Sequence, residues 1–466
     1  MAKNGLIWGF SLSLFLFAVF YLIEPKLAFL LSAVILLITL SFIDLKYAFY
    51  LFLVVLPLSF NIPLNVGGLK DIFVADGVFL VLFGVLIVKK IIANDLKLIN
   101  TILTATIFSF VAISILSILV AEIRMDSNEL YRINSILHIR YARLNPLTVS
   151  PVSMSNFFVF FRTFFPLFLY YFVHETFSTD KREVKRVMKI LLLSAMATAA
   201  FGWLSKYNLV PDSIYSLYHT TYHQASLFRI PSTFDNPQSF GTFLALSICI
   251  VYYYILEKPR NIALYFTGAF LFFIFLFTYS FGSYAALIGG LFLITLLSRR
   301  LSAGGRIAII AVVCIAFVSI VLSNDFILEK IRVSTTIVNP RKQFPGTVQT
   351  RIIKWGRWMK IIQPHLLTGL GYPTVWQDNN YVKMLVNAGI LGFLSYYFMI
   401  GIMIFRGVKL YLQQKGDRLG IIFLVSAVIF LIHSISYDVS IVFKVNAYFF
   451  IFAAFVSKGL HEKKNI

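Results

Sequence analysis

The sequence predicts an all-α integral membrane protein that crosses the bilayer many times. Hydrophobic residues make up 59% of its 466 residues, charged residues make up only 13%, and the mean hydropathy is +0.84. A soluble protein of this length could not bury so much apolar surface in its core. The charged residues cluster between apolar stretches of about 17 to 22 residues, each long enough to cross a hydrocarbon layer roughly 30 Å thick.

Hydrophobicity predicts about fourteen transmembrane helices in a single domain that covers 1–466. The first stretch is too long for the apolar part of a signal peptide and lacks a small-x-small cleavage site, so we expect it to be retained. The predicted spans are 5–23, 27–43, 46–60, 72–90, 100–121, 155–174, 188–206, 238–256, 261–279, 282–298, 307–323, 380–404, 419–434 and 441–457.

The basic turns predict which side of the membrane each loop occupies. If the N-terminus is cytoplasmic, every short turn rich in lysine or arginine falls on the cytoplasmic side, as the positive-inside rule requires. An even number of spans then returns the C-terminus to the cytoplasm. Three longer segments are left outside, 122–154, 207–237 and 324–379, and we expect the last two to be periplasmic loops that contain helices and the functional site.

These outer segments carry more positive charge than the positive-inside rule predicts. The net charge of +21 does not indicate nucleic acid, because the basic residues lie in loops between spans. Cations kept on the outer side favour an anionic ligand there, and ordinary solvated loop charges are the alternative. The outer cations are Arg124, Arg132, Arg140, Arg143, Arg229, Lys330, Arg332, Arg341, Lys342, Arg351, Lys354, Arg357 and Lys360.

Arg229 begins the stretch RIPSTFDNPQSFGTFLAL, residues 229–246, which passes through a turn directly into a predicted span. The proline and glycine residues are explained by the turn, but the arginine is not. A guanidinium at the membrane edge suits bidentate contact with phosphate or carboxylate. Snorkelling of the arginine toward lipid headgroups is the alternative.

A second arginine lies in VQTRIIKWGRWMKIIQPHLLTGLGYP, residues 348–373, whose first fifteen residues predict an amphipathic helix that ends before Pro364. At 100° per residue, Lys354, Arg357 and Lys360 share the polar side. Arg351 falls on the apolar side, so we expect it to be buried with a partner. That partner is either a ligand or an acid such as Asp378.

Asp378 stands at the mouth of a predicted span, in the stretch WQDNNYVKMLVNAGILGFLSYY, residues 376–397. A carboxylate there can accept a proton in catalysis, or it can simply cap the helix. Arg162 is an ionisable residue inside another span, where such residues usually have a function or snorkel from near an end.

No sequence pattern predicts a metal or a cofactor. His219 and His223 have i, i+4 spacing, but no carboxylate or cysteine pattern accompanies them. Nucleotide-binding and dinucleotide-binding fingerprints are absent from the sequence. We therefore predict no metal site and no cofactor.

The order and spacing of these segments resemble the O-antigen polymerase and O-antigen ligase superfamily. The resemblance covers about residues 155–400 and depends on RIPSTFDNPQSFG, TYSFGSYAAL, RIIKWGRWMKIIQPHLLTGLGYP and DNNYVKMLVNAGILG. Ligases of this family have a His-Asn or His-Ser pair where this chain has Asp378-Asn379-Asn380, which is similar to the Wzy-type polymerases. Phe281-Gly282 stands where the family often has an arginine, so no role is expected for 280–283.

The resemblance implies a metal-independent, inverting glycosyltransferase of the bacterial inner membrane. It would polymerise undecaprenyl-diphosphate-linked oligosaccharides into O-antigen or exopolysaccharide at a site that faces the periplasm or the cell exterior. Expected partners are these lipid-linked oligosaccharides, membrane lipids and a chain-length regulator. The alternatives are a ligase that transfers glycan to lipid A core or protein, and a flippase or exporter of lipid-linked oligosaccharides.

The predicted site follows from this reaction. Arg229 and Arg351 would stabilise the leaving diphosphate, and Asp378 would accept the proton of the attacking hydroxyl. The residues predicted to bind substrate are Asn379, Asn380, Arg162, Lys354, Arg357 and Tyr381.

Overall fold

The fold is that of a helical membrane protein. Six of the helices in the described part of the chain are long and apolar enough to cross a membrane, namely α5, α8, α10, α16, α17 and α18. The computed structural model describes residues 35–62, 72–95, 102–124, 129, 132–133, 135–136, 154–177, 181–218, 229–234, 236–322, 347–372, 379–413, 418–438 and 443–462.

The helices follow one another along the chain with short connections. The first half contains α3 (Leu45–Leu58), α4 (Val74–Ile92), α5 (Ile102–Arg124), α7 (Met154–Thr176), α8 (Lys181–Lys206) and α9 (Asp212–Tyr218). The second half contains α10 (Pro237–Glu257), α11 (Ile262–Leu276), α12 (Phe281–Leu297), α13 (Ala303–Leu322), α15 (Thr347–Ile362), η2 (Gln363–His365), α16 (Asn380–Gln413), α17 (Arg418–Ser436) and α18 (Phe443–Glu462). Two short strands, β1 (Asn61–Ile62) and β2 (Ile72–Phe73), pair antiparallel between α3 and α4.

Helices occur at each predicted span from 46–60 to 441–457. The predicted span 5–23 and most of 27–43 lie outside the described residues. The helical membrane class is therefore confirmed, while the count of fourteen spans remains a prediction. The amphipathic helix predicted before Pro364 is also confirmed, as α15.

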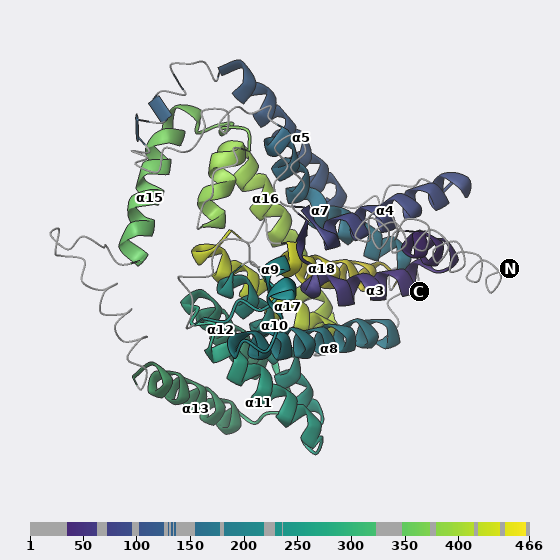
Figure 1. The fold of residues 1–466 in the computed structure, drawn as a ribbon, viewed down its shortest axis with the longest axis vertical. Coiled ribbons are helices and arrows are strands. Elements are labelled where there is room, and N and C mark those ends of the chain that lie inside the picture. Colours follow the sequence, from purple (N-terminus) through teal and green to yellow (C-terminus); the bar gives the residue numbers. More distant parts are fainter. Residues whose placement is uncertain are drawn as a thin grey trace.

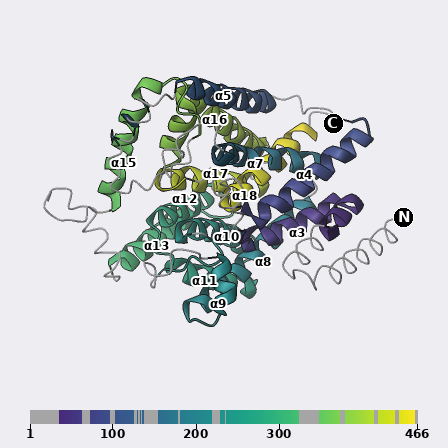
Figure 2. The same cartoon turned by 45° about the horizontal axis from the view of Figure 1, so that its top comes forward.

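The centre of the bundle is formed by α10, α17 and α18, which pack against one another and against α12 and α7 (Figures 1 and 2). Most of α10 and α18 is buried inside the protein, whereas most of α5 is not. Aromatic rings fill the junction of α3, α4, α7 and α18, where Phe79 contacts Phe52, Phe165 and Phe443. In Figure 1, α15 lies at the left edge, away from this centre.

Helix α16 is broken near Ala388 and Gly389, although the sequence predicts an uninterrupted apolar segment there. Gly389 has a φ of 63°, and a Cβ added to it would lie 2.4 Å from the Leu367 carbonyl oxygen, so only glycine fits. Backbone hydrogen bonds from Leu370 N to Val386 O (2.7 Å) and from Ile390 N to Leu366 O (2.8 Å) fill the break. The segment that follows α15 is thereby fixed to the middle of α16.

Candidate functional site

The loop that carries Arg229 is held inside the bundle by backbone contacts. Ile230 N donates to Phe277 O at 3.0 Å, and Arg229 Nε donates to Thr278 O at 2.9 Å. Further along the loop, Thr233 Oγ1 donates to Pro57 O at 2.6 Å. These contacts fix the Arg229 side chain beside the residues that precede α12.

A buried cation from α18 completes the support of this loop. Lys444 Nζ donates to the carbonyl of Thr233 at 2.6 Å and to the carbonyl of Ser59 at 2.5 Å. Lys444 is 3% exposed. An ammonium group satisfies two carbonyls that the bundle interior would otherwise leave without partners. This single side chain therefore connects the Arg229 loop to the end of α3.

Arg229 and Arg351 interact electrostatically, although they come from different segments of the chain. Burial lowers the pKa of the Arg229 guanidinium, and the positive charge of Arg351 acts in the same direction. Within the described ranges, neither arginine forms an ion pair with a carboxylate. Two like charges held together this way favour an anion between them.

His433 lies in the last turn of α17 and interacts electrostatically with Arg351. It is 1% exposed, and among the residues that the structure describes neither ring nitrogen has a hydrogen-bond partner. A Cβ placed on Gly282 would lie 3.4 Å from His433 Nδ1 and 2.0 Å from Ser436 Oγ. The glycine therefore lets the first turn of α12 approach this imidazole closely.

Three of the residues predicted to bind substrate have internal partners at the start of α16. The Asn379 side-chain oxygen accepts from Tyr381 N (2.8 Å) and Val382 N (3.1 Å) and therefore caps the helix. Asn380 Nδ2 donates to the Tyr397 hydroxyl at 3.2 Å. The Tyr381 hydroxyl donates to Leu431 O at 3.1 Å. The contacts of the Asn379 side-chain oxygen and of Asn380 stabilise α16 itself, and the contact of Tyr381 joins α16 to α17.

Asp378 lies outside the described residues, so its predicted role as proton acceptor stays a prediction. Its alternative role was that of a helix cap, and Asn379 already occupies that position. The helix therefore does not require a carboxylate at residue 378.

The remaining predicted residues lie on α7 and α15. Arg162 is 8% exposed, and its Nε lies 3.7 Å from Asp76 Oδ2, so its charge is paired with a carboxylate inside the bundle. On α15, Lys354 is exposed and Arg357 is partly exposed, as expected for the polar side of the helix. The opposite side is buried through Trp358 and Ile362, whereas Met359 is exposed.

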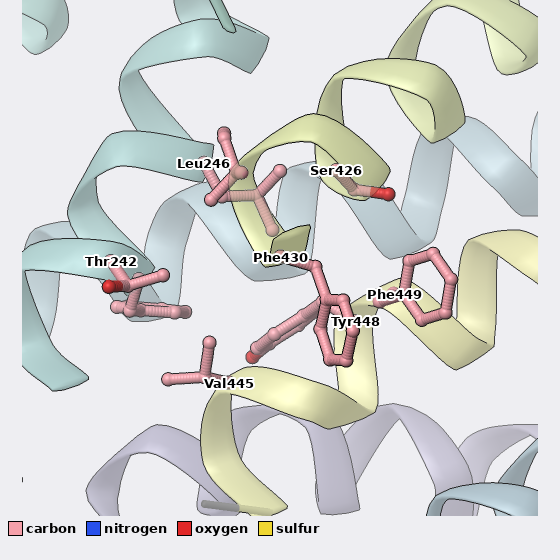
Figure 3. A pocket seen from close by; sticks show the side chains of 9 residues that line it. Thr242, Leu246, Ser426, Phe430, Val445, Tyr448 and Phe449 are labelled. Carbon is pink, nitrogen blue, oxygen red and sulfur yellow. The ribbon is translucent and has the colours of Figure 1, made fainter. Parts of the chain in front are cut away.

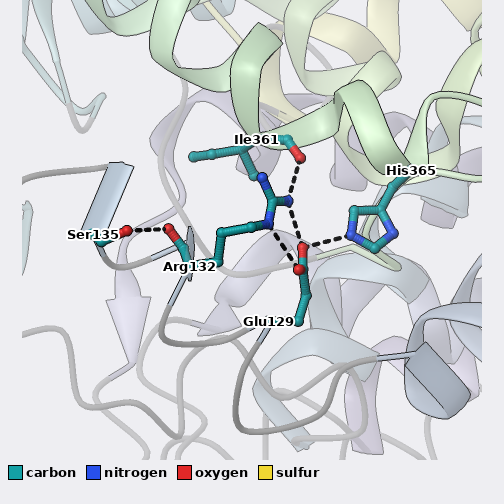
Figure 4. A network of polar contacts seen from close by, with 5 residues as sticks. All are labelled: Glu129, Arg132, Ser135, Ile361 and His365. Atoms are coloured by element: carbon teal, nitrogen blue, oxygen red, sulfur yellow. Dashed lines mark hydrogen bonds and ion pairs between the residues drawn. The ribbon is translucent and has the colours of Figure 1, made fainter.

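Figure 4 shows a second polar cluster, in which Glu129 lies between Arg132 and His365. Arg132 Nε donates to Glu129 Oε2 at 2.8 Å, Arg132 Nη2 donates to Ile361 O at 3.0 Å, and His365 Nε2 lies 2.7 Å from Glu129 Oε1. The hydrogen bonds from Arg132 lower the pKa of Glu129 to about 2. This cluster connects the segment after α5 to the end of α15.

A buried ion pair joins α16 to the end of α17. Lys383 Nζ lies 2.5 Å from Asp438 Oδ2, and both side chains are almost completely buried. Asp438 also interacts electrostatically with Tyr396 and Tyr397. Lys383 lies one turn beyond Asn379, and Asp438 follows the last turn of α17, which contains His433.

The sequence analysis did not select His433, Lys444, Lys383 or Asp438. All four are ionisable residues at or near the ends of apolar segments, the same signal that selected Arg162. That rule, applied to every span, would have found them.

One small cavity inside the bundle does not provide an alternative site. The cavity in Figure 3 is lined by Thr242, Ser426, Phe430 and Tyr448, and its volume is about 10 Å³. That is space for about one water molecule, which could bind the Tyr448 hydroxyl. It is too small for a substrate.

Comparison with protein-family models and with curated proteins finds no match for this chain.

Proposed function

We propose that this protein is a membrane glycosyltransferase that joins oligosaccharide units carried on a polyprenyl diphosphate, in the manner of an O-antigen polymerase. The main support is the convergence of Arg229 and Arg351, which interact electrostatically and have no carboxylate partner in the described part of the chain. A diphosphate offers the density of negative charge that two guanidinium groups can bind in a bidentate manner.

The proposed reaction needs two kinds of group. A hydroxyl of the acceptor sugar attacks the anomeric carbon of the donor, a new C–O bond forms, and the bond to the diphosphate breaks. The diphosphate takes the electron pair of that bond, and fixed guanidinium groups stabilise the developing charge. The hydroxyl proton passes to an acceptor group, for which the sequence offers Asp378.

The position of the site in the membrane is part of the proposal. The chain would lie in the bacterial inner membrane with both termini cytoplasmic and with α15 on the periplasmic side. Fusions to alkaline phosphatase should be active near residue 340 and inactive near residue 184. The reverse pattern would contradict this orientation.

The product distinguishes a polymerase from a ligase. In a strain that lacks the protein, lipid-linked single repeats should accumulate, whereas loss of a ligase would leave long lipid-linked polymer. If this strain has unchanged glycan on both the lipid carrier and the cell surface, the protein is neither a polymerase nor a ligase.

Arg351→Lys and Lys354→Ala form a matched pair of variants for the site. An ammonium cannot reproduce the planar fork of a guanidinium, so we expect Arg351→Lys to lose polymer. Lys354 is exposed one turn away, and its replacement should have little effect. Equal losses of polymer at equal expression would show that Arg351 is an ordinary loop charge.

A further inference from the structure

His433 has no evident structural reason to be a histidine. A buried imidazole normally uses at least one ring nitrogen in a hydrogen bond, because a polar group without a partner destabilises the folded state. In the described ranges, Nδ1 and Nε2 both lack a partner. A histidine kept only for packing could be replaced by an apolar ring at no cost, so the orphaned nitrogens point to a ligand.

The surroundings of His433 show which ligand would reach it. Its Nδ1 lies close to the first turn of α12, because Gly282 has no side chain to separate the two. Arg351 acts on the imidazole electrostatically from α15, and Arg229 acts on Arg351 in turn. The imidazole thus lies within electrostatic reach of Arg351, one of the two arginines that are proposed to bind the diphosphate.

We propose that His433 accepts the proton of the acceptor hydroxyl during glycosyl transfer, an inference that rests on the proposed function. As the hydroxyl oxygen forms its bond to the anomeric carbon, its proton moves to a ring nitrogen, and the C–O bond to the diphosphate breaks. The imidazolium then faces the departing diphosphate, whose negative charge balances it. The proton returns to water after the product leaves.

Elementary electrostatics favours His433 over Asp378 for this step. A carboxylate near the start of a helix is stabilised in its charged form, which makes it a weaker base. In the described ranges the His433 imidazole has no carboxylate partner that would hold a proton before the reaction starts. It also lies on α17, a helix that packs against α12, α16 and α18, which suits precise alignment with the acceptor hydroxyl.

The test uses the full-length protein in lipid nanodiscs with a synthetic undecaprenyl-diphosphate oligosaccharide. His433→Gln keeps a polar side chain but cannot take a proton at neutral pH. We expect turnover to fall by about 100-fold or more, while the affinity for undecaprenyl diphosphate alone should change less than about twofold. The number of diphosphate-binding sites measures folded protein, so turnover is expressed per site. His433→Asn provides a second amide if the glutamine does not fit.

Ser434→Ala is the matched control, because Ser434 is buried beside His433 and, among the described residues, bonds the Phe430 carbonyl alone. Its turnover should stay near that of the wild type. Wild-type turnover in His433→Gln would overturn the role of His433. Loss of all turnover in Asp378→Asn, together with no loss of turnover in His433→Gln, would also overturn it. If the wild-type protein forms no polymer from this substrate, the proposed function itself fails.

Discussion

Breaking the buried ion pair between Lys383 and Asp438 should destabilise the protein strongly, whereas replacing both residues should not. At 2.5 Å and an effective dielectric constant of about 20, the two charges attract by roughly 6–7 kcal/mol. The desolvation of each ion costs several kcal/mol, so the net contribution of the pair is small. Removing one partner leaves the other charge buried and unpaired, at a cost of about 3–5 kcal/mol.

Lys383→Met, Asp438→Asn and the double variant form a double-mutant cycle. In domains of about 150–250 residues, 1 kcal/mol corresponds to roughly 2–4 °C in Tm. At about 2 °C per kcal/mol, a cost of about 3–5 kcal/mol means that each single variant should melt about 6–10 °C below the wild type in detergent. The double variant should melt above both single variants. Lys46→Met tests a more exposed ion pair, with Glu183, and its cost should be at most about 1 kcal/mol.

The reasoning would be refuted by additive losses of Tm in the cycle. Additivity would mean that the two charges do not depend on one another. A single variant with wild-type Tm would also contradict it, because the remaining charge would then have to reach solvent. Melting is followed by tryptophan fluorescence and by the loss of the monodisperse peak in size-exclusion chromatography.

Three further predictions concern the supports of the site. Gly389→Ala should lower the yield of folded protein severely, because the added Cβ would clash with a backbone carbonyl; normal yield and Tm would contradict the broken helix. Lys444→Met should lower Tm and polymer yield together, since two buried carbonyls lose their donor; Lys444→Arg should recover part of both, and equal activity in all three proteins would contradict a supporting role. Glu129→Gln should cost about 1–3 kcal/mol of folding stability at pH 7, because the pKa of Glu129 is lowered to about 2 in the folded protein. This stabilisation is present above the unfolded pKa near 4.5 and is lost as the pH falls toward 2. The difference in stability between variant and wild type should therefore shrink below about pH 4, and a difference that does not change with pH would refute the assignment.

Hydropathy alone was enough to place the long apolar helices of the described chain, because a membrane span needs a long apolar run whatever it packs against. It did not predict the break in α16. That break depends on a hydrogen-bonded segment, 366–371, which comes from before the helix in the sequence. Gly389 offered a hint, but a glycine inside an apolar helix is common in membrane proteins.

The sequence singles out the arginines but not the residues that support them. Arg229 and Arg351 stand out because positive charge on the predicted outer side breaks a general rule. Lys383 and Asp438 are 55 residues apart in the sequence, and nothing local indicates that they meet in space. His433 is a single histidine in an apolar run, and only the structure shows that its nitrogens lack partners.

The contact between Lys444 and Thr233 has a consequence for the biosynthesis of the protein. The two residues are 211 positions apart. At about 5–20 residues per second, the ribosome takes roughly 10–40 s to reach the lysine after it has made the loop. During that interval the carbonyls of Thr233 and Ser59 lack the donor that Lys444 supplies in the folded protein. The membrane insertion of α18 therefore completes the support of the loop that carries Arg229.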